Sequence, residues 1–263
     1  MLTLGIDIGS ATSKVAVMRG GTVVLATALR RAGIGSDGPG AVLRDALRLA
    51  GCQMEDIAAV AATGYGRNMM EEADYRISEL SCHGRGAHFL APETRTLIDV
   101  GGQDAKVIRL DGRGRIMEFM MNDKCAAGTG RFLEVMAQVL GCGIQEFSGL
   151  AEGQEAAPIS STCAVFAETE VISRLAAGTP RGSIAAGINL SIAKRVGGLA
   201  MRMGVVPAVM MSGGVAQNAS LVDMLGRELG ADILVAKECQ FCGALGAALL
   251  AWEKTRASGR KAP

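Results

Sequence analysis

The sequence predicts an α/β fold built from two duplicated domains. Short β-rich runs alternate with segments whose apolar residues recur at helical spacing, which is typical of layered α/β proteins. A motif that begins at Asp7 returns at Asp99, so the two halves of the chain open alike. We expect one domain over residues 1–94 and a second over residues 95–263, with the C-terminal helix packing back on the first.

Nine β-rich runs are predicted to be strands. They span Leu2–Ile8, Lys14–Met18, Thr22–Ala28, Ile57–Ala62, Thr96–Val100, Lys106–Leu110, Arg115–Phe119, Ala208–Met211 and Ile233–Ala236. Helices are predicted where apolar residues lie on one helical face and a glycine follows as a stop. They run from Pro39 to Gly51, from Thr129 to Gly141, from about Cys163 to Gly178 and from Ile184 to Met203.

The internal repeat aligns two turns in the same register. Asp7–Val15 and Asp99–Val107 share Asp-x-Gly followed by Lys-Val at equal spacing. Each copy begins at the end of a predicted strand and enters a second strand, a turn and a third strand. Such duplicated openings predict two domains that face each other across a cleft.

The composition excludes several classes of partner. The chain has 263 residues, with 27 Lys and Arg against 26 Asp and Glu, so no long-range field favours nucleic acid or an anionic membrane. One Trp and two Tyr supply little surface for stacking bases. No apolar run reaches about 18 residues and the N-terminus does not look like a signal peptide, so we expect a cytoplasmic protein.

The paired turns are suited to binding a polyphosphate. A carboxylate at the end of a buried strand can hold hydrated Mg²⁺, and glycines let backbone N–H groups approach phosphate oxygens. A single Asp-x-Gly is more often an ordinary hairpin turn, but the shared register favours a nucleotide site. A third Gly-rich element, Met211–Asn218, follows another predicted strand.

These turns supply the candidate site residues. The predicted nucleotide-binding residues are Gly9, Ser10, Ala11, Thr12, Ser13, Lys14, Gly101, Gly102, Gln103, Gly128, Thr129, Gly130, Gly213, Gly214, Val215 and Asn218. Asp7, Asp99, Gln103 and Asp104 are the predicted catalytic residues. Gln103 could orient an attacking water and Asp104 could bind Mg²⁺ or accept a proton, although both also suit ordinary turn chemistry.

The order of these elements resembles the ATPase superfamily of actin, hexokinase and the heat-shock chaperones. No Gly-x-x-x-x-Gly-Lys-Ser/Thr motif occurs, so this is not a P-loop protein. The resemblance implies that Gly213 and Gly214 approach the adenosine and α-phosphate. It also implies that Gly243–Ala248 is a small-residue helix beside the interdomain hinge.

Two of the seven cysteines are candidate metal ligands. Cys125 precedes one predicted helix and Cys163 begins another, where the positive end of a helix dipole favours the thiolate. Both could instead be buried packing residues. A [4Fe-4S] cluster needs four thiolates, so a two-fold axis in a homodimer would supply them. An intrachain site that adds Cys239 and Cys242 is the alternative, and Cys52, Cys82 and Cys142 are expected to pack in the core.

Taken together, the motifs closely resemble the ATPase activators of 2-hydroxyacyl-CoA dehydratases, which are related to benzoyl-CoA reductase ATPase subunits and double-cubane cluster protein reductases. The matching segments are Asn122–Glu134, Ser160–Glu168, Asp99–Asp104, Gly213–Asn218, Ala62–Arg67 and Glu79–His83.

The resemblance implies a homodimer with one oxygen-sensitive [4Fe-4S] cluster, reduced by ferredoxin or flavodoxin. It implies that ATP binding and hydrolysis to ADP, with Mg²⁺, pass one electron to an iron-sulfur acceptor enzyme. The acceptor could be a dehydratase, an aromatic-ring reductase or a double-cubane cluster protein.

Two other functions stay open from the sequence. The first is a small-molecule kinase of the same fold with structural cysteines, although the chain leaves no room for a substrate-binding insertion. The second is a nucleotide-gated iron-sulfur sensor. His83 is given no role, because a histidine on a helix is usually packed and hydrogen-bonded.

Overall fold

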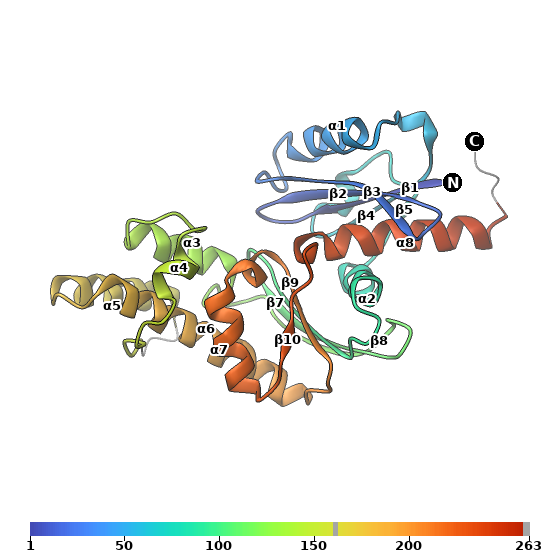
Figure 1. Ribbon diagram of the computed structural model, residues 1–263. Coiled ribbons are helices and arrows are strands. Elements are labelled where there is room, and N and C mark those ends of the chain that lie inside the picture. The colour runs from blue at the N-terminus through green and yellow to red at the C-terminus, as the bar shows by residue number, and fades with distance from the viewer. Residues whose placement is uncertain (160–162, 260–263) are drawn as a thin grey trace. The chain divides into compact units, whose positions relative to one another are not determined.

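The computed structural model describes residues 1–159 and 163–259 and contains two five-stranded sheets with helices packed on each (Figure 1). The strands are β1 (Leu2–Ile8), β2 (Ser13–Arg19), β3 (Val23–Arg30), β4 (Ile57–Thr63), β5 (Tyr75–Arg76), β6 (Thr96–Val100), β7 (Ala105–Leu110), β8 (Ile116–Asn122), β9 (Val209–Ser212) and β10 (Ile233–Leu234). The helices are α1 (Gly38–Ala50), α2 (Glu79–Leu90), α3 (Gly130–Val139), α4 (Phe147–Ala151), α5 (Ala164–Ala176), α6 (Arg181–Met203), α7 (Ala219–Leu229) and α8 (Cys242–Ala257). Short 3₁₀ turns are η1 (Met54–Asp56), η2 (Arg67–Met69), η3 (Gly214–Gln217) and η4 (Cys239–Phe241).

The chain divides into two compact units. Unit 1 comprises Met1–Thr94, the hairpin tip Leu110–Met117 and the chain from Gln240 onward. Unit 2 comprises Arg95–Arg109 and Glu118–Cys239. The α8 helix therefore belongs to the unit that contains the N-terminal sheet.

The two sheets share one topology. The first has the order β3-β2-β1-β4-β5 and the second has β8-β7-β6-β9-β10, read from its other edge. In the first sheet β1 pairs antiparallel with β2 and parallel with β4. In the second sheet β6 pairs in the same way with β7 and β9. The predicted duplicated α/β fold is confirmed, and the repeat in the sequence corresponds to a repeat of strand order.

Helices cover both faces of the sheet in unit 1. The α1 helix packs on β2 and β3, while α8 packs on β1, β2 and β4 and is itself covered by α2 (Figure 1). The α1 helix buries Val42 and Ala46 and ends at Gly51, whose φ of 65° is the left-handed conformation of a helix C-cap. Thus the glycine predicted as the stop of this helix has that role.

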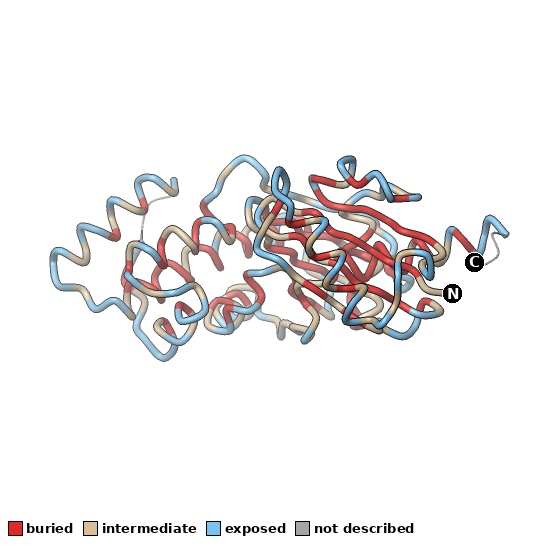
Figure 2. The backbone as a smooth tube through the Cα atoms, turned by 90° about the horizontal axis from the view of Figure 1, so that it is seen from above, coloured by how far each residue is buried: buried red, intermediate tan, exposed pale blue. Residues whose placement is uncertain are grey.

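The core of unit 2 is built around the long helix α6. Thirteen of its 23 residues are buried, including Ile184, Ile188 and Ile192, so it carries the apolar stripe that the sequence predicts. The α6 helix packs against α4, α5 and α7. Buried residues, red in Figure 2, follow the central strands and the inner faces of the helices.

The predicted elements and the structure differ in a few places. The β10 strand ends at Leu234, because only Ile233 and Leu234 pair with β9. The short elements β5 and α4 were not predicted, since two and five residues are too few to display a period. Helix α5 begins at Ala164, and the residues before Cys163 in the Ser160–Glu168 motif lie outside the described part of the chain.

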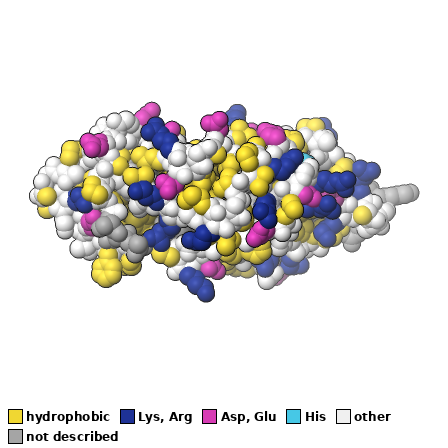
Figure 3. Space-filling model, turned by 90° about the horizontal axis from the view of Figure 1, so that it is seen from below, with side chains coloured by type: hydrophobic (Ala, Val, Ile, Leu, Met, Phe, Trp, Pro, Cys, Tyr) yellow, Lys and Arg dark blue, Asp and Glu magenta, His cyan; other side chains and the backbone are white. Residues whose placement is uncertain are grey.

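No helix among the described residues is long and apolar enough to cross a membrane. On the face seen in Figure 3, basic and acidic side chains are interspersed, in keeping with the net charge of +1.

We predict that Gly5→Ala destabilises the protein. A Cβ at Gly5 would lie 2.0 Å from the carbonyl oxygen of Ala244 and 2.4 Å from the backbone nitrogen of Ala248, so β1 and α8 could not approach as they do. Overpacking against a rigid backbone should lower the free energy of unfolding by about 3 kcal/mol or more, measured in urea.

Gly40→Ala is the matched control, because a Cβ there meets only the flexible end of Arg44, at 3.5 Å, on the exposed side of α1. It should leave stability unchanged or raise it by up to about 1 kcal/mol. Equal stability of the two variants would show that β1 and α8 are not packed this closely.

Candidate nucleotide site and cysteine loop

Both Asp-x-Gly turns have the same backbone geometry. Asp7 is the second-last residue of β1 and lies opposite Lys14 on β2, and Asp99 lies opposite Lys106 on β7 in the same register. The N–H of Gly9 donates to the carbonyl oxygen of Thr12 at 2.9 Å, and the N–H of Gly101 donates to that of Asp104 at 3.0 Å. The duplicated motif therefore builds two equivalent turns.

The neighbouring parallel strand adds a third residue to each turn. Thr63 on β4 pairs with Asp7, and Ser212 on β9 pairs with Asp99. A glycine with positive φ follows each one, Gly64 at 81° and Gly213 at 88°. The equivalence of Thr63-Gly64 and Ser212-Gly213 is not apparent in the sequence, because strand pairing between distant segments creates it.

These two glycines leave room beside the carboxylates. A Cβ at Gly64 would lie 2.5 Å from Oδ1 of Asp7, and a Cβ at Gly213 would lie 3.1 Å from Oδ1 of Asp99. At each strand end, the backbone of a glycine, which has no Cβ, thus lies close to the carboxylate of a buried aspartate. This is the geometry that lets backbone amides and a cation share one phosphate group.

Buried charges are concentrated in the second turn. The ammonium of Lys106 lies 2.7 Å from Oδ1 of Asp104 and 3.6 Å from Oδ2 of Asp99, and all three residues are at most 3% exposed. The hydroxyl of Ser212 donates to Asp99 at 2.7 Å. Two carboxylates and one ammonium group therefore lie together in this turn, and carboxylate oxygens are ligands that suit a divalent cation with its phosphate.

The first turn also has a lysine–aspartate ion pair. Lys14 Nζ lies 3.2 Å from Oδ2 of Asp7. Gly9, Ser10 and Thr12 are partly exposed and Ala11 is exposed, so this loop can meet a ligand. Ser13 is fully buried and its hydroxyl donates to the carbonyl oxygen of Ala32 at 2.7 Å, so this side chain stabilises the loop.

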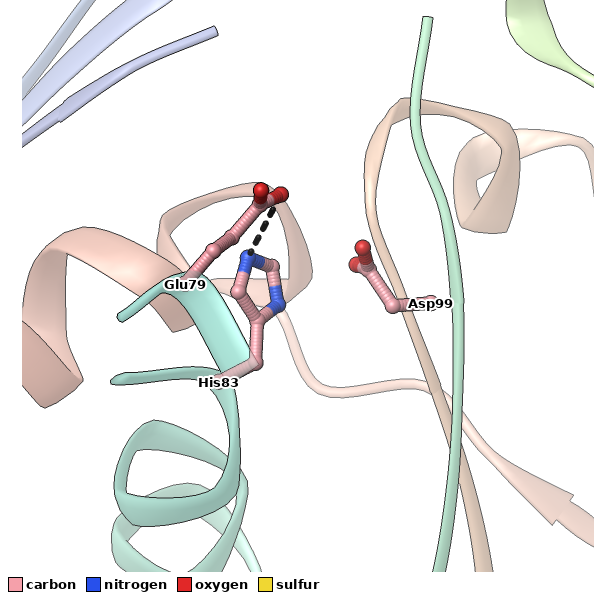
Figure 4. Close-up of side chains that lie close together, drawn as sticks. All are labelled: Glu79, His83 and Asp99. Atoms are coloured by element: carbon pink, nitrogen blue, oxygen red, sulfur yellow. Dashed lines mark ion pairs between the residues drawn. The ribbon is translucent and has the colours of Figure 1, made fainter. Parts of the chain in front are cut away.

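His83, which the sequence left without a role, lies beside the first turn. A Cβ at Gly243 would lie 2.8 Å from Nε2 of His83 and 3.1 Å from Oδ2 of Asp7. Figure 4 shows His83 directed toward Glu79 on the same helix, with 3.9 Å between Nε2 and Oε1. Asp99, the third residue drawn there, lies on β6.

The third Gly-rich element is held by side-chain amides. Asn218 caps α7 by accepting the N–H of Leu221 at 3.1 Å, and it donates to Asn189 on α6 at 2.9 Å. Gly214 is exposed and Val215 is buried. The side chain of Asn218 therefore joins the end of the Gly-rich loop to α6 and to the start of α7.

The segment from Gly128 to Gly130 joins the second turn to the loop that carries Cys125. The N–H of Gly130 donates to the carbonyl oxygen of Gly101, and that of Arg131 to the carbonyl oxygen of Gly102, both at 2.8 Å. Thr129 is fully buried, and its hydroxyl donates to Ala126 at 2.6 Å. The start of α3 is thus bound to a predicted phosphate turn.

This arrangement corrects the predicted environment of Cys125. The sequence placed this cysteine at a helix N-terminus, but α3 begins at Gly130 and its first two N–H groups bind Gly101 and Gly102. Cys125 instead lies half-buried in the preceding loop, where Nη1 of Arg195 donates to its sulfur at 3.6 Å. Cys163 does occupy the N-cap of α5 and is exposed.

The remaining cysteines have the character of packing residues. Cys82, Cys239 and Cys242 are buried, and the thiol of Cys242 donates to the carbonyl oxygen of His83 at 3.3 Å. Burial raises the pKa of the Cys82 thiol to about 12 and also raises the pKa values of Cys52 and Cys142. Thiols of raised pKa are poor metal ligands, because the thiolate is the ligating form.

Gln103, the remaining residue predicted in the second turn, is exposed.

Two equivalent Asp-x-Gly turns on duplicated five-stranded sheets, with a Gly-rich loop after β9, define an ATPase of the actin and hexokinase type. The protein-family comparison agrees: the model of the BadF/BadG/BcrA/BcrD ATPase family matches residues 4–251, so the chain belongs to this family. The predicted resemblance and the prediction of an ATPase are confirmed.

Three curated relatives align with the chain over nearly their whole length. The chain is 52% identical to the activator of lactoyl-CoA dehydratase of Anaerotignum propionicum, covering 96% of this chain and 98% of the relative. It is 49% identical to the (R)-2-hydroxyglutaryl-CoA dehydratase activating ATPase of Acidaminococcus fermentans, covering 96% and 97%. It is also 32% identical to a component of the benzoyl-CoA reductase of Thauera aromatica, covering 94% and 92%.

Solved structures agree with this family and fold. The activator of 2-hydroxyisocaproyl-CoA dehydratase from Clostridium difficile, solved with bound ADPNP, has a TM-score of 0.96 and 48% identity, covering 99% of this chain and 97% of that one. A ROK family glucokinase from Streptomyces griseus, at 17% identity, has a TM-score of 0.59, covering 96% and 100%. The glucokinase shares the fold alone.

We predict that Lys106→Met lowers stability by about 3–5 kcal/mol, because it leaves Asp99 and Asp104 as buried carboxylates without their ammonium partner. Urea unfolding measures the loss. Lys237→Met removes an exposed ammonium and should stay within about 0.5 kcal/mol of the unmodified protein. A Lys106 variant as stable as this control would contradict the buried charge triad.

Proposed function

We propose that this protein is an ATP-driven one-electron activator. ATP with Mg²⁺ binds the paired turns, and its hydrolysis to ADP and phosphate accompanies the passage of one electron to a separate iron-sulfur enzyme. The named activities of the relatives, dehydratase activators at 48–52% identity, support this role. The observation that carries the proposal is the pair of hydrogen bonds from Gly130 and Arg131 to the second turn, because they join a proposed phosphate turn to the end of the loop that carries Cys125.

Cys125 and Cys163 are the residues proposed to hold a [4Fe-4S] cluster, which would accept and release a single electron. Their surroundings fit such a group. Cys163 is exposed and Cys125 is half-buried, so both sulfurs can take part in a shared site at the surface. Each chain contributes two thiolates, so a second copy completes the set of four.

The surface of α5 supports a homodimer beside Cys163. Only Ala167 and Val171 of this helix are buried. Val165 and Phe166 are each 69% exposed, and Ile172 is 52% exposed. Large apolar side chains next to a proposed ligand are suited to contact with the same face of a second copy.

The nucleotide can act on the cysteine through the second turn. A γ-phosphate or Mg²⁺ that moves Gly101 and Gly102 also moves Gly130 and Arg131, whose N–H groups bind their carbonyl oxygens. The loop from Cys125 to Thr129 ends at this point. A shift of the loop changes the hydrogen bonding and solvent access of the sulfur, and both influence the reduction potential.

The remaining roles follow from the same site. Asp7, Asp99 and Asp104 are the proposed catalytic carboxylates, which would hold Mg²⁺ or its water ligands, and the amide of Gln103 would orient the attacking water. Ferredoxin or flavodoxin is the proposed electron donor in the cytoplasm. The acceptor is a 2-hydroxyacyl-CoA dehydratase, with an aromatic-ring reductase or a double-cubane cluster protein as the alternative acceptors.

We predict that anaerobically prepared protein is a brown dimer with about four iron atoms per dimer. Cys125→Ser and Cys163→Ser should each lose colour and iron while ATP is still hydrolysed, because the phosphate turns remain intact. Cys142→Ser, which changes a partly buried cysteine of the same unit, should keep both.

About eight iron atoms per dimer would instead indicate an intrachain site that includes Cys239 and Cys242. A colourless protein that still hydrolyses ATP would overturn the electron-transfer role and favour the kinase alternative.

We also predict that Gly130→Ala weakens coupling. A Cβ there would lie 3.0 Å from the carbonyl oxygen of Gly101 and 3.5 Å from Cα of Gly102, so the start of α3 must move away from the turn. The difference in reduction potential between the ADP state and the state with a non-hydrolysable ATP analogue should fall by about half or more.

Gly149→Ala is the control for this experiment, because a Cβ at Gly149 has no neighbour within 4 Å. Iron content should stay normal in both variants. An unchanged nucleotide-dependent shift in Gly130→Ala would exclude coupling through these hydrogen bonds.

A further inference from the structure

Arg195 on α6 contacts the cysteine loop at two separate points. Its Nη1 donates to the sulfur of Cys125 at 3.6 Å. Its aliphatic stem lies against Gly128, where a Cβ would be 2.8 Å from Cδ and 3.5 Å from Cγ of Arg195. Gly128 has a φ of 102°, so the loop adopts a conformation that favours glycine where the stem crosses it.

The helix holds Arg195 firmly. Its neighbours Ile192, Val196 and Leu199 are buried in the core of unit 2. Arg195 itself is half-buried, whereas the adjacent Lys194 is exposed. About 1.7 turns earlier on the same helix, Asn189 accepts a hydrogen bond from the side-chain amide of Asn218, which ends the Gly-rich loop.

We propose that Arg195 is a positioning residue for the metal ligand Cys125. The guanidinium fixes the direction of the sulfur, and the stem fixes the shape of the loop between Cys125 and Thr129. This inference rests on the proposed function, because it takes Cys125 to be a cluster ligand.

The charge of Arg195 has a second consequence. One-electron reduction adds a negative charge to a cluster, and a nearby cation with an N–H···S hydrogen bond stabilises the more negative state. Arg195 therefore raises the reduction potential and slows loss of the cluster.

The test compares three variants of the full-length dimer. Arg195→Gln removes the charge and the donor fork, and Arg195→Lys keeps the charge but changes the contact with Gly128. Lys194→Gln removes an exposed charge one residue away and is the matched control. The reduction potential is measured by titration monitored by electron paramagnetic resonance, and iron release by an iron chelator under anaerobic conditions.

We expect Arg195→Gln to have a lower reduction potential than Lys194→Gln and to release iron about 10- to 100-fold faster, the usual effect of removing a residue that orients a metal ligand. Arg195→Lys should have a potential between those of Arg195→Gln and the unmodified protein. Thermal unfolding of the iron-free proteins shows whether Arg195→Gln folds. If it does not fold, the same two measurements are compared between Arg195→Lys and Lys194→Gln.

Equal potentials and equal iron release in Arg195→Gln and Lys194→Gln would overturn the role of Arg195. If iron content is lost in Cys125→Ser at the same time, the proposed function still stands. If Cys125→Ser keeps its iron, the proposed function fails whatever the Arg195 variants do.

Discussion

The structure depends on the pairing of a buried aspartate with a lysine across the first two strands of each sheet. This register places Asp7 opposite Lys14 and Asp99 opposite Lys106, and it fixes where each Gly turn begins. A one-residue slip of an antiparallel pair would move every side chain of the strand to the other face. Because the adjacent strand faces are packed into the cores of the two units, the register and the turn geometry are specified together.

The sequence predicted the two turns because the residues of each turn are contiguous. Asp-x-Gly and Lys-Val lie within nine residues, so their repetition can be read directly. Thr63, Ser212 and Arg195 could not be found in this way, because each joins its site through pairing or packing with a distant segment. For Lys106, the repeat showed only that it corresponds to Lys14. Its contact with Asp104 could not be predicted, because it depends on how the backbone of the turn folds.

Helices were predictable where one face is apolar. The α1, α3 and α6 helices bury regular stripes, whereas α2 packs on α8 through glycines, so its bounds do not follow from apolar periodicity. A Cβ at Gly86 would lie 1.9 Å from the carbonyl oxygen of Cys242, and one at Gly246 would lie 1.7 Å from that of Cys82. The prediction that Cys125 lies at a helix N-terminus was wrong for a related reason. The sequence locates the start of a helix but does not say which acceptors bind its first N–H groups.

The hydrogen bonds from Gly130 and Arg131 to Gly101 and Gly102 also have a consequence in the opposite direction. Coupling between two bound groups is reciprocal, so a nucleotide that alters the affinity for an electron must bind more or less tightly after the electron arrives. An activator of the kind proposed would therefore bind ATP, relative to ADP, more tightly in one redox state than in the other. Bound nucleotide would then mark the redox state of the protein, because the ratio of bound ATP to bound ADP would differ between the two states.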